Sequence, residues 1–288
     1  MDGIFLIDKP IGITSRSVCN QIGKKFHTKK VGHLGTLDPF ASGVLIVAIN
    51  KATKALTFLD ESIKEYIATI KLGIETDSLD NTGKVIKEIT PKKYSEEDII
   101  NVLTKFKGDL KQVPPMTSAI HVNGKRLYEL AHQGIEVERT AREITVYENK
   151  LISYDLEKDE ITVYFKVSSG TYIRTLGSDI AKELGSIGHL NKLERVGVSV
   201  FSINECVSLE DVLSDNVSPK EVKDILSKVM EVVSYNDEKV NEIKNGKIRF
   251  LDIKSNSNKI LVVDFSSHEV AVYLKNKDNK FEFARGLF

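Results

Sequence analysis

The sequence predicts an α+β fold in which one large domain is followed by a small β-barrel. Predicted strands and helices are mixed along the 288 residues without the regular strand–helix–strand repeat of a doubly wound sheet. Short strands at 260–264, 270–274 and 281–283 are separated by Ser, Asn, Asp and Lys turns, a pattern typical of a small barrel. A chain of this length can bury a large core and a small one.

The N-terminal segment is predicted to contain two strands and one helix. Residues 4–8 form a short apolar strand, and Thr14 or Ser15 then caps a helix whose apolar residues recur at helical spacing. These residues are Val18, Ile22 and Phe26. Residues 44–49 are continuously apolar, which indicates a buried strand.

The next segment is predicted to form a strand and a capped helix. Residues 64–72 alternate well enough for a strand, and one face of it carries Tyr66, Ala68, Ile70 and Leu72. Ser95 and Asp98 have the spacing of a capping box, which marks the start of a helix. The apolar side of that helix consists of Ile99, Leu103 and Phe106.

Residues 112–146 have the composition of a long functional insertion. They are rich in Gly, His, Lys and Arg, and only 127–132 form a short helical patch. Strands at 144–154 and 161–167, a helix at 175–184 and an acidic, helical connector at 209–233 are predicted to follow.

Charge is unevenly distributed along a chain whose formal net charge is zero, with 41 basic and 41 acidic residues. Residues 1–60 hold eight Lys or Arg against four acidic residues, whereas residues 205–240 hold four against nine. The first region therefore suits an RNA surface, although charge runs are more often solvated faces. Local basic clusters occur at Lys24, Lys25, Lys29 and Lys30, at Lys125 and Arg126, and at Arg139 and Arg142.

Cysteine spacing and apolar run length exclude several protein classes. Cys19 and Cys206 lie far apart without the spacing of metal ligands, so we expect neither a disulfide framework nor a zinc site. The longest apolar run, 44–49, is far shorter than the ~20 residues that span a bilayer. The N-terminus resembles a strand rather than a signal peptide, which predicts a cytoplasmic protein.

Residues 31–43, VGHLGTLDPFASG, place the carboxylate of Asp38 in a predicted turn that precedes a strand. Glycine can adopt backbone angles that other residues rarely adopt, and this segment contains Gly32, Gly35 and Gly43. Pro39 fixes its own φ. A lone Asp-Pro pair usually does no more than begin a turn. In this setting, the tight loop is expected to hold an acidic side chain rigidly, as chemistry requires.

The segment GHLGTLDPFASGVL resembles the catalytic-aspartate motif of pseudouridine synthases, specifically the family that modifies uridine 55 in the T-loop of bacterial tRNA. Four other segments match this family in order: FLIDKPIGITS, KEYIATIKLGIETDSLDNTG, QVPPMTSAIHVNGKRLYELAHQGIEVER and SSGTYIRTLGSDIAKELGSIGHLNKLERVGVS. The resemblance covers residues 3–200 and, more weakly, a tail in which KNGKIRFLD resembles part of an RNA-binding PUA domain.

The resemblance implies a mainly antiparallel, mixed-sheet pseudouridine synthase catalytic domain at 1–230 and a PUA-like domain at 231–288. Residues 112–146 would form an RNA-gripping thumb whose cations are Lys125, Arg126, Arg139 and Arg142. The reaction isomerises uridine and involves no redox change, so we expect no cofactor and no metal.

The resemblance also assigns roles to single residues of the catalytic domain. Asp38 would be the nucleophile, and an adjacent Arg174 would pair with it and keep it ionised. Tyr66 would stack on the target base and assist proton transfer. Leu193 matches an apolar residue of the same pocket, and Tyr172, in the segment GTYIR, is expected to contact the substrate.

Two further residues concern access to the target base. Uridine 55 is stacked in the folded T-loop and must be flipped out before reaction, and His33 matches a histidine that fills the vacated space. Lys9, in the KPIG turn, either buttresses that turn or contacts phosphate, and the sequence leaves both roles open.

The leading hypothesis is a tRNA pseudouridine synthase that acts on the T-arm without guide RNA, membrane or protein partner. One alternative is the related guide-dependent synthase of box H/ACA particles, which shares the same motifs. A second is a mainly RNA-binding or RNA-folding protein. Binding alone does not require Asp38, Tyr66 and Arg174 together, which favours an enzyme.

Overall fold

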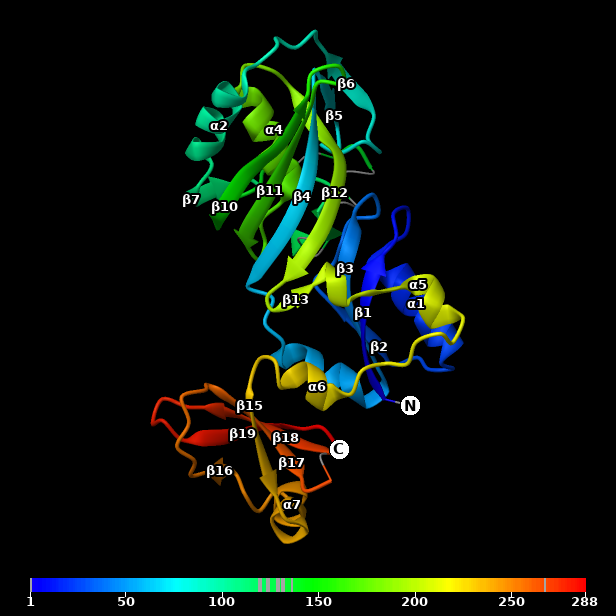
Figure 1. Cartoon of the computed structure of the whole chain (residues 1–288), viewed down its shortest axis with the longest axis vertical. Coiled ribbons are helices and arrows are strands. Elements are labelled where there is room, and N and C mark those ends of the chain that lie inside the picture. Colours follow the sequence, from blue (N-terminus) through cyan, green and yellow to red (C-terminus); the bar gives the residue numbers. More distant parts are fainter. Residues whose placement is uncertain are drawn as a thin grey trace. The chain divides into compact units, whose positions relative to one another are not determined.

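The computed structural model describes residues 2–118, 121–122, 125–127, 130, 133–135, 137–266 and 268–288. The chain divides into two compact units, each assembled from separated stretches of sequence (Figure 1). Unit 1 comprises residues 1–38, 44–61 and 200–288, and unit 2 comprises residues 39–43 and 62–199.

Unit 2 is built on an antiparallel sheet with the strand order β12-β4-β11-β10-β7. Its strands are β4 (Ile63–Leu72), β7 (Gly108–Gln112), β10 (Arg142–Asp155), β11 (Glu160–Ser168) and β12 (Gly188–Val198). Two hairpins, β5 (Ile74–Thr76) with β6 (Val85–Glu88) and β8 (His121–Val122) with β9 (Lys125–Arg126), lie outside that sheet. The predicted strands at 64–72, 144–154 and 161–167 are confirmed.

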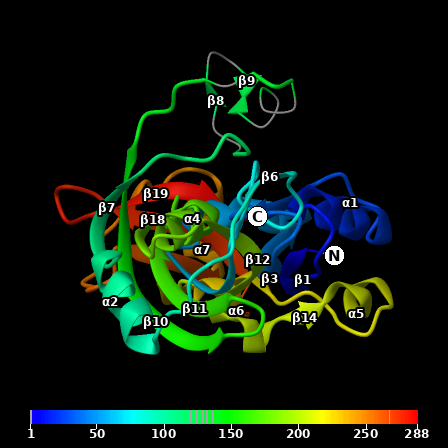
Figure 2. The same cartoon turned by 90° about the horizontal axis from the view of Figure 1, so that it is seen from above.

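Two helices accompany this sheet, α2 (Glu96–Lys105) and α4 (Ile173–Glu183). The predicted capping box is present, because Ser95 Oγ accepts a hydrogen bond from the Asp98 amide and the Asp98 carboxylate accepts one from the Ser95 amide. The sheet curls around α4, which packs against β4 and β12 (Figure 2). Alternate residues of β4 from Tyr66 to Leu72 are all buried, as the sequence predicts.

Strand β12 was not predicted, although it pairs with β4 along its whole length. Its ladder has an irregularity between Leu190 and Lys192 and another between Arg195 and Gly197. Each bulge shifts the alternation of buried and exposed residues by one position, so a period-two search does not recognise the strand.

The N-terminal part of unit 1 packs α1 (Ser15–Lys25) on a small group of strands. These strands are β1 (Gly3–Lys9), β2 (Val31–Leu34), β3 (Ser42–Ile49) and β14 (Val207–Ser208). Thr14 caps α1 by accepting a hydrogen bond from the Ser17 amide at 3.0 Å, and Val18 and Ile22 enter the core, so the predicted helix is confirmed. The strand predicted at 44–49 is also confirmed.

Short elements complete this part of the chain. They are the 3-10 helices η1 (Asn50–Phe58) and η2 (Ile203–Glu205), strand β13 (Phe201–Ser202) and helices α5 (Leu209–Leu213) and α6 (Val222–Leu226). The connector predicted at 209–233 is therefore only partly helical, and its last residues already belong to a strand.

The C-terminal residues form a five-stranded sheet with the order β15-β17-β18-β19-β16. The elements are β15 (Glu231–Tyr235), α7 (Asp237–Lys244), β16 (Phe250–Leu251), β17 (Lys259–Asp264), β18 (Glu269–Lys275) and β19 (Phe281–Gly286). Ile260, Val262 and Tyr273 are fully buried in its core. The three short strands expected here are confirmed, and β15 and α7 are additions to them.

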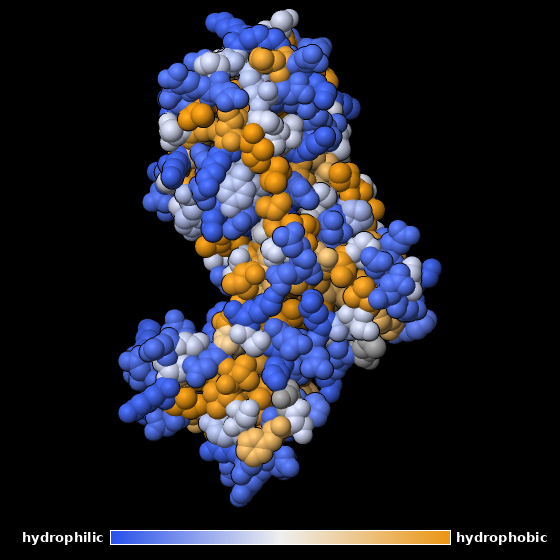
Figure 3. Space-filling model, viewed as in Figure 1, coloured by the Kyte–Doolittle hydropathy of each residue, from blue (hydrophilic) through white to orange (hydrophobic). Residues whose placement is uncertain are grey.

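Polar and charged side chains cover most of the visible face of the molecule (Figure 3). Within the described residues, no helix is long and apolar enough to cross a membrane. The domain boundary at residue 230 stays a prediction.

Candidate active site

The loop between β2 and β3 carries Asp38 and is anchored on both sides of it. Leu37 and Phe40 are buried, whereas Asp38 itself is half-buried. The Leu37 amide donates to Ser15 Oγ at 2.9 Å, which fastens the loop to the first residue of α1. Fixed neighbours and a partly exposed carboxylate are what a nucleophile requires.

The turn around Asp38 is shorter than the sequence predicts. Residues 31–34 form β2, paired with β3 from Val31 opposite Ile49 to Leu34 opposite Ile46. Gly32 lies inside this strand and is not among the residues with positive φ, whereas Gly35 and Gly43 have φ values of 66° and 107°. The expectation that Gly32 supplies an unusual backbone angle is therefore wrong.

Gly43 is required by a close backbone approach as well as by its φ. A Cβ at this position would lie 2.2 Å from the carbonyl oxygen of Arg195, the residue that pairs with Gly43 within unit 2. Because backbone cannot move aside as a flexible side chain can, we expect Gly43→Ala to lower the free energy of unfolding by more than about 2 kcal/mol.

Urea denaturation checks this prediction. The matched control is Gly185→Ala, since Gly185 has φ 78° but nothing within 4 Å of an added Cβ. The control should cost only the left-handed backbone penalty of about 1–2 kcal/mol. Equal losses in the two variants would show that the approach to Arg195 is unimportant.

His33 lies on β2 between a thiol and a hydroxyl. Its Nδ1 is 3.4 Å from Cys19 Sγ, and its Nε2 is 3.2 Å from Thr36 Oγ1. Burial raises the pKa of the Cys19 thiol, although the nearby Arg16 opposes this. A protonated thiol that donates to Nδ1 leaves Nε2 to donate to Thr36, so these two neighbours can fix the orientation and tautomer of the ring.

The raised pKa of Cys19 makes stability depend on pH above the thiol's ordinary range. Below the unfolded pKa, near 9.0, the thiol is protonated in both states. As pH rises further, the unfolded chain releases this proton first, so this contribution to the free energy of unfolding falls until the folded pKa is passed. Denaturation from about pH 8 to 10 should show this fall in the wild type and a smaller one in Cys19→Ala. Identical pH profiles would contradict it.

Arg174 lies in the first turn of α4 and is only 3% exposed. Its Nη1 donates to Ser78 O at 2.9 Å and to Thr117 Oγ1, and its Nη2 donates to Thr117 O at 2.9 Å. Nη1 also lies 3.4 Å from the buried carboxylate of Asp80. The guanidinium thus joins α4, the loop after β5 and the start of the 113–141 insertion within unit 2.

Asp80 was not singled out in the sequence, although it lies in the matching segment ETDSLDNTG. Its Oδ1 accepts hydrogen bonds from Ser78 Oγ at 2.8 Å, from Thr82 Oγ1 at 2.6 Å and from the Thr82 amide at 3.0 Å. A hydroxyl residue two positions before the aspartate and another two positions after it could have revealed this self-bonded turn. The predicted pairing of Arg174 with Asp38 stays a prediction.

The main sheet brings Tyr66 and Leu193 to the same face. Tyr66 on β4 is directly opposite Arg195 on β12, and Leu193 is opposite Ala68. Because directly opposed residues of an antiparallel pair point to one side, Tyr66, Leu193 and Arg195 share a face. Tyr66 and Leu193 are each 7% exposed, and Arg195 is fully buried. Arg195 was not singled out in the sequence, because its strand was not recognised.

Tyr172 and Lys9 each form two hydrogen bonds that fix the local backbone. The Tyr172 amide donates to Gln112 Oε1 at 2.8 Å and its carbonyl accepts from Gln112 Nε2 at 3.0 Å, which ties the start of α4 to the end of β7. Lys9 is fully buried, and its Nζ donates to Pro10 O and Ile13 O, each at 2.8 Å. Two roles were left open for Lys9, support of the KPIG turn and contact with phosphate, and these hydrogen bonds favour support of the turn.

The insertion leaves and rejoins the sheet at one rung, where Gln112 pairs with Arg142. Arg142 therefore belongs to β10, and Arg139 donates from Nη1 to Pro114 O at 3.2 Å. Lys125 and Arg126 form β9, and their side chains lie outside the described residues. Most of the helical patch predicted at 127–132 lies outside them as well.

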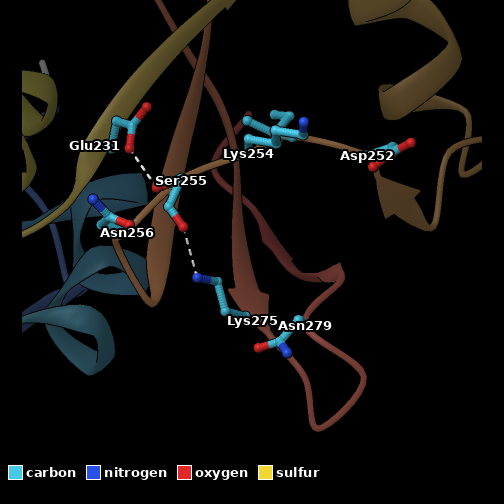
Figure 4. A pocket seen from close by; sticks show the side chains of 8 residues that line it. Glu231, Asp252, Lys254, Ser255, Asn256, Lys275 and Asn279 are labelled. Carbon is cyan, nitrogen blue, oxygen red and sulfur yellow. Dashed lines mark hydrogen bonds between the residues drawn. The ribbon is translucent and has the colours of Figure 1, made fainter.

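A polar pocket of about 760 Å³ lies in the C-terminal sheet (Figure 4). Ser255 Oγ donates to the Glu231 carboxylate, and Lys275 Nζ donates to Ser255 O at 2.7 Å. These contacts join β15 to β18 through the intervening loop, and none of the lining residues was singled out in the sequence. In the described ranges, no group of three or more His, Cys, Asp or Glu could hold a metal ion.

Comparison with known proteins identifies relatives over most of the chain. The family model described as TruB family pseudouridylate synthase (N terminal domain) matches residues 23–173. The tRNA pseudouridine synthase B of Hydrogenovibrio crunogenus is 41% identical over 246 residues, 85% of this chain and 80% of that protein. The protein of the same name from Aquifex aeolicus is 41% identical over 250 residues, 86% of each.

The fold of this chain also matches the folds of solved structures. A chain in the crystal structure of a Cbf5–Nop10–Gar1 complex matches with a TM-score of 0.71, at 24% identity, over 99% of this chain and 85% of that one. An archaeal box H/ACA Nop10–Cbf5 complex gives a TM-score of 0.69 at 21% identity, over 99% of this chain and 86% of that one. At this identity the likeness shows the fold, and the predicted α+β class with a small C-terminal β-domain is confirmed.

Proposed function

Because the chain belongs to the TruB family of pseudouridylate synthases, enzymes that convert uridine to pseudouridine, we propose that it isomerises uridine 55 in the T-loop of tRNA without guide RNA. Asp38 acts as the nucleophile. The relatives from Hydrogenovibrio crunogenus, Geotalea uraniireducens and Aquifex aeolicus, at 41–47% identity, are each named tRNA pseudouridine synthase B, which supports tRNA as the substrate.

The observation that carries the proposal is the set of polar groups held in buried positions of unit 2. Tyr66 and Arg174 are each less than a tenth exposed, and four hydrogen-bond acceptors hold the Arg174 guanidinium. Burying a cation costs free energy that RNA binding alone would not require, since exposed lysines and arginines bind phosphate without that cost. A buried, fixed charge instead suits a reaction in which charge develops away from water.

The reaction rearranges bonds within one nucleotide. The bond between ribose C1′ and uracil N1 breaks, the uracil rotates, and C5 bonds to C1′. The proton on C5 is released and N1 takes up a proton, so atoms and electrons balance without an oxidant or reductant. The Asp38 carboxylate forms a transient covalent adduct, Arg174 favours its ionised form, and Tyr66 stacks on the base.

The remaining residues prepare the substrate. His33 occupies the space of the flipped base, and Cys19 and Thr36 hold its ring. Residues 112–146 form the RNA-gripping thumb, and its cations are Lys125, Arg126, Arg139 and Arg142. Residues 231–288 form the PUA-like RNA-binding domain, and 1–230 form the catalytic domain.

Tritium release tests the proposal. Purified protein is incubated with unmodified tRNA labelled at uracil C5, and release of one tritium per tRNA is expected. A transcript with cytidine at position 55, labelled in its uridines, is the control and should release none. Release that requires added guide RNA would favour the H/ACA-type alternative, and binding without release would favour an RNA-folding protein.

A further inference from the structure

A groove of about 630 Å³ runs along α1 and the turn that follows it in unit 1. Its lining consists of Arg16, Cys19, Asn20, Gly23, Lys24, His27, Thr28, Lys29 and Val31. Arg16, Asn20 and Lys24 recur every four residues, so they lie on one face of the helix. The cluster of lysines seen in the sequence is thereby divided: Lys24 and Lys29 line the groove, and Lys25 and Lys30 do not.

The groove is cationic and its lining includes no carboxylate. Arg16, Lys24 and Lys29 are exposed, and none of them has an acidic partner within the described part of the chain. Lys25 differs from them, because its Nζ forms an ion pair with Asp215 at 2.5 Å. Three uncompensated cations, with the Asn20 amide and the His27 ring beside them, make this surface a site for an anion.

The floor of the groove connects it to the proposed base-flipping histidine. Cys19 lines the groove, and the Sγ of the same residue is 3.4 Å from Nδ1 of His33. A ligand in the groove is therefore separated from His33 by a single side chain. The groove therefore lies close enough to His33 to bind the backbone of the nucleotides next to the flipped base.

We propose that the α1 groove binds the phosphate backbone of the substrate RNA, a proposal that rests on the proposed function. The cations are exposed and spread from Arg16 to Lys29, rather than converging on one point as in a small-anion site. A row of separated cations matches the regular negative charge of a nucleic-acid strand. It also gives a location to the excess positive charge of residues 1–60 in a chain of zero net charge.

The test compares two variants of the full chain that carry the same change in charge. Lys24→Gln/Lys29→Gln removes two groove cations, and Lys25→Gln/Lys30→Gln removes their sequence neighbours outside the groove. The affinity for unmodified tRNA is measured over a range of KCl concentrations. We expect the groove variant to lose about tenfold in affinity at low salt and the slope of log K against log salt to fall by about 2.

The neighbour variant should keep the wild-type slope, and thermal denaturation should show that both variants are folded. Equal slopes in the two variants would overturn the proposal. A repeat in potassium phosphate at matched ionic strength should give the same affinities as KCl. Competition by phosphate that disappears in the groove variant would instead identify a small-anion site and also overturn it.

The experiments can refute the groove proposal and the proposed function separately. Absence of tritium release from wild-type protein would contradict the function whatever the salt slopes are. Normal tritium release by the wild type, together with equal slopes in the two variants, would leave the function intact and eliminate the groove.

Discussion

Replacing Asp38 with Asn is expected to reduce the single-turnover rate of pseudouridine formation by about 10⁴-fold or more while leaving tRNA affinity nearly unchanged. The amide keeps the size of the carboxylate but lacks the charge and the nucleophilic oxygen. Since Asp38 is half-buried between the buried Leu37 and Phe40, the substitution should not disturb the loop. Rapid mixing with excess enzyme, followed by tritium release, measures the rate.

A matched control is Asp77→Asn, which changes an aspartate in an exposed turn where the Lys84 amide donates to its side chain. The control should retain the wild-type rate. A near-normal rate in Asp38→Asn would remove Asp38 from the chemistry, and a loss of tRNA affinity equal to the loss of rate would make it a binding residue.

The second large effect is expected at Arg174. Arg174→Lys should slow the single-turnover rate by about 10²–10³-fold, because a point charge cannot serve the four acceptors that the guanidinium serves. Buried acceptors left unpaired at Ser78 and Thr117 should also lower the free energy of unfolding by about 1–3 kcal/mol. The rate at saturating tRNA and urea denaturation give the two values separately.

The variant Asp80→Asn tests whether Asp80 and Arg174 act as one unit. The two groups are 3% and 7% exposed, so the ion pair is poorly screened and each should depend on the other. We expect the double variant Asp80→Asn/Arg174→Lys to be less impaired than the product of the single effects. The control is Arg249→Lys, whose exposed ion pair with Glu282 should contribute almost nothing. Additive single effects would mean that Asp80 does not act through Arg174.

Residue patterns in the sequence were sufficient to predict a strand or helix wherever the burial of its residues follows one period. The alternation from Tyr66 to Leu72 fixed both the strand β4 and its buried face, because each second residue enters the same core. The caps at Thr14 and Ser95 were readable because the donor and acceptor lie within three residues of each other. These are local interactions, and local sequence contains both partners.

Patterns failed where the deciding partner is distant in sequence. The bulges of β12 conceal its period, and so Arg195 was not noticed. Gly32 was expected to supply an unusual backbone angle, but its pairing with Ala48 makes it part of a strand.

The sequence by itself determined the family and the α+β class and predicted the candidate reactive residues, because these depend on residue types in a fixed order. Only the tertiary structure decided which groups meet. Asp80 lies 94 positions from Arg174, and Cys19 lies 14 positions from His33. Such contacts arise from the packing of separate elements, and no local period encodes the distance between two side chains brought together in this way.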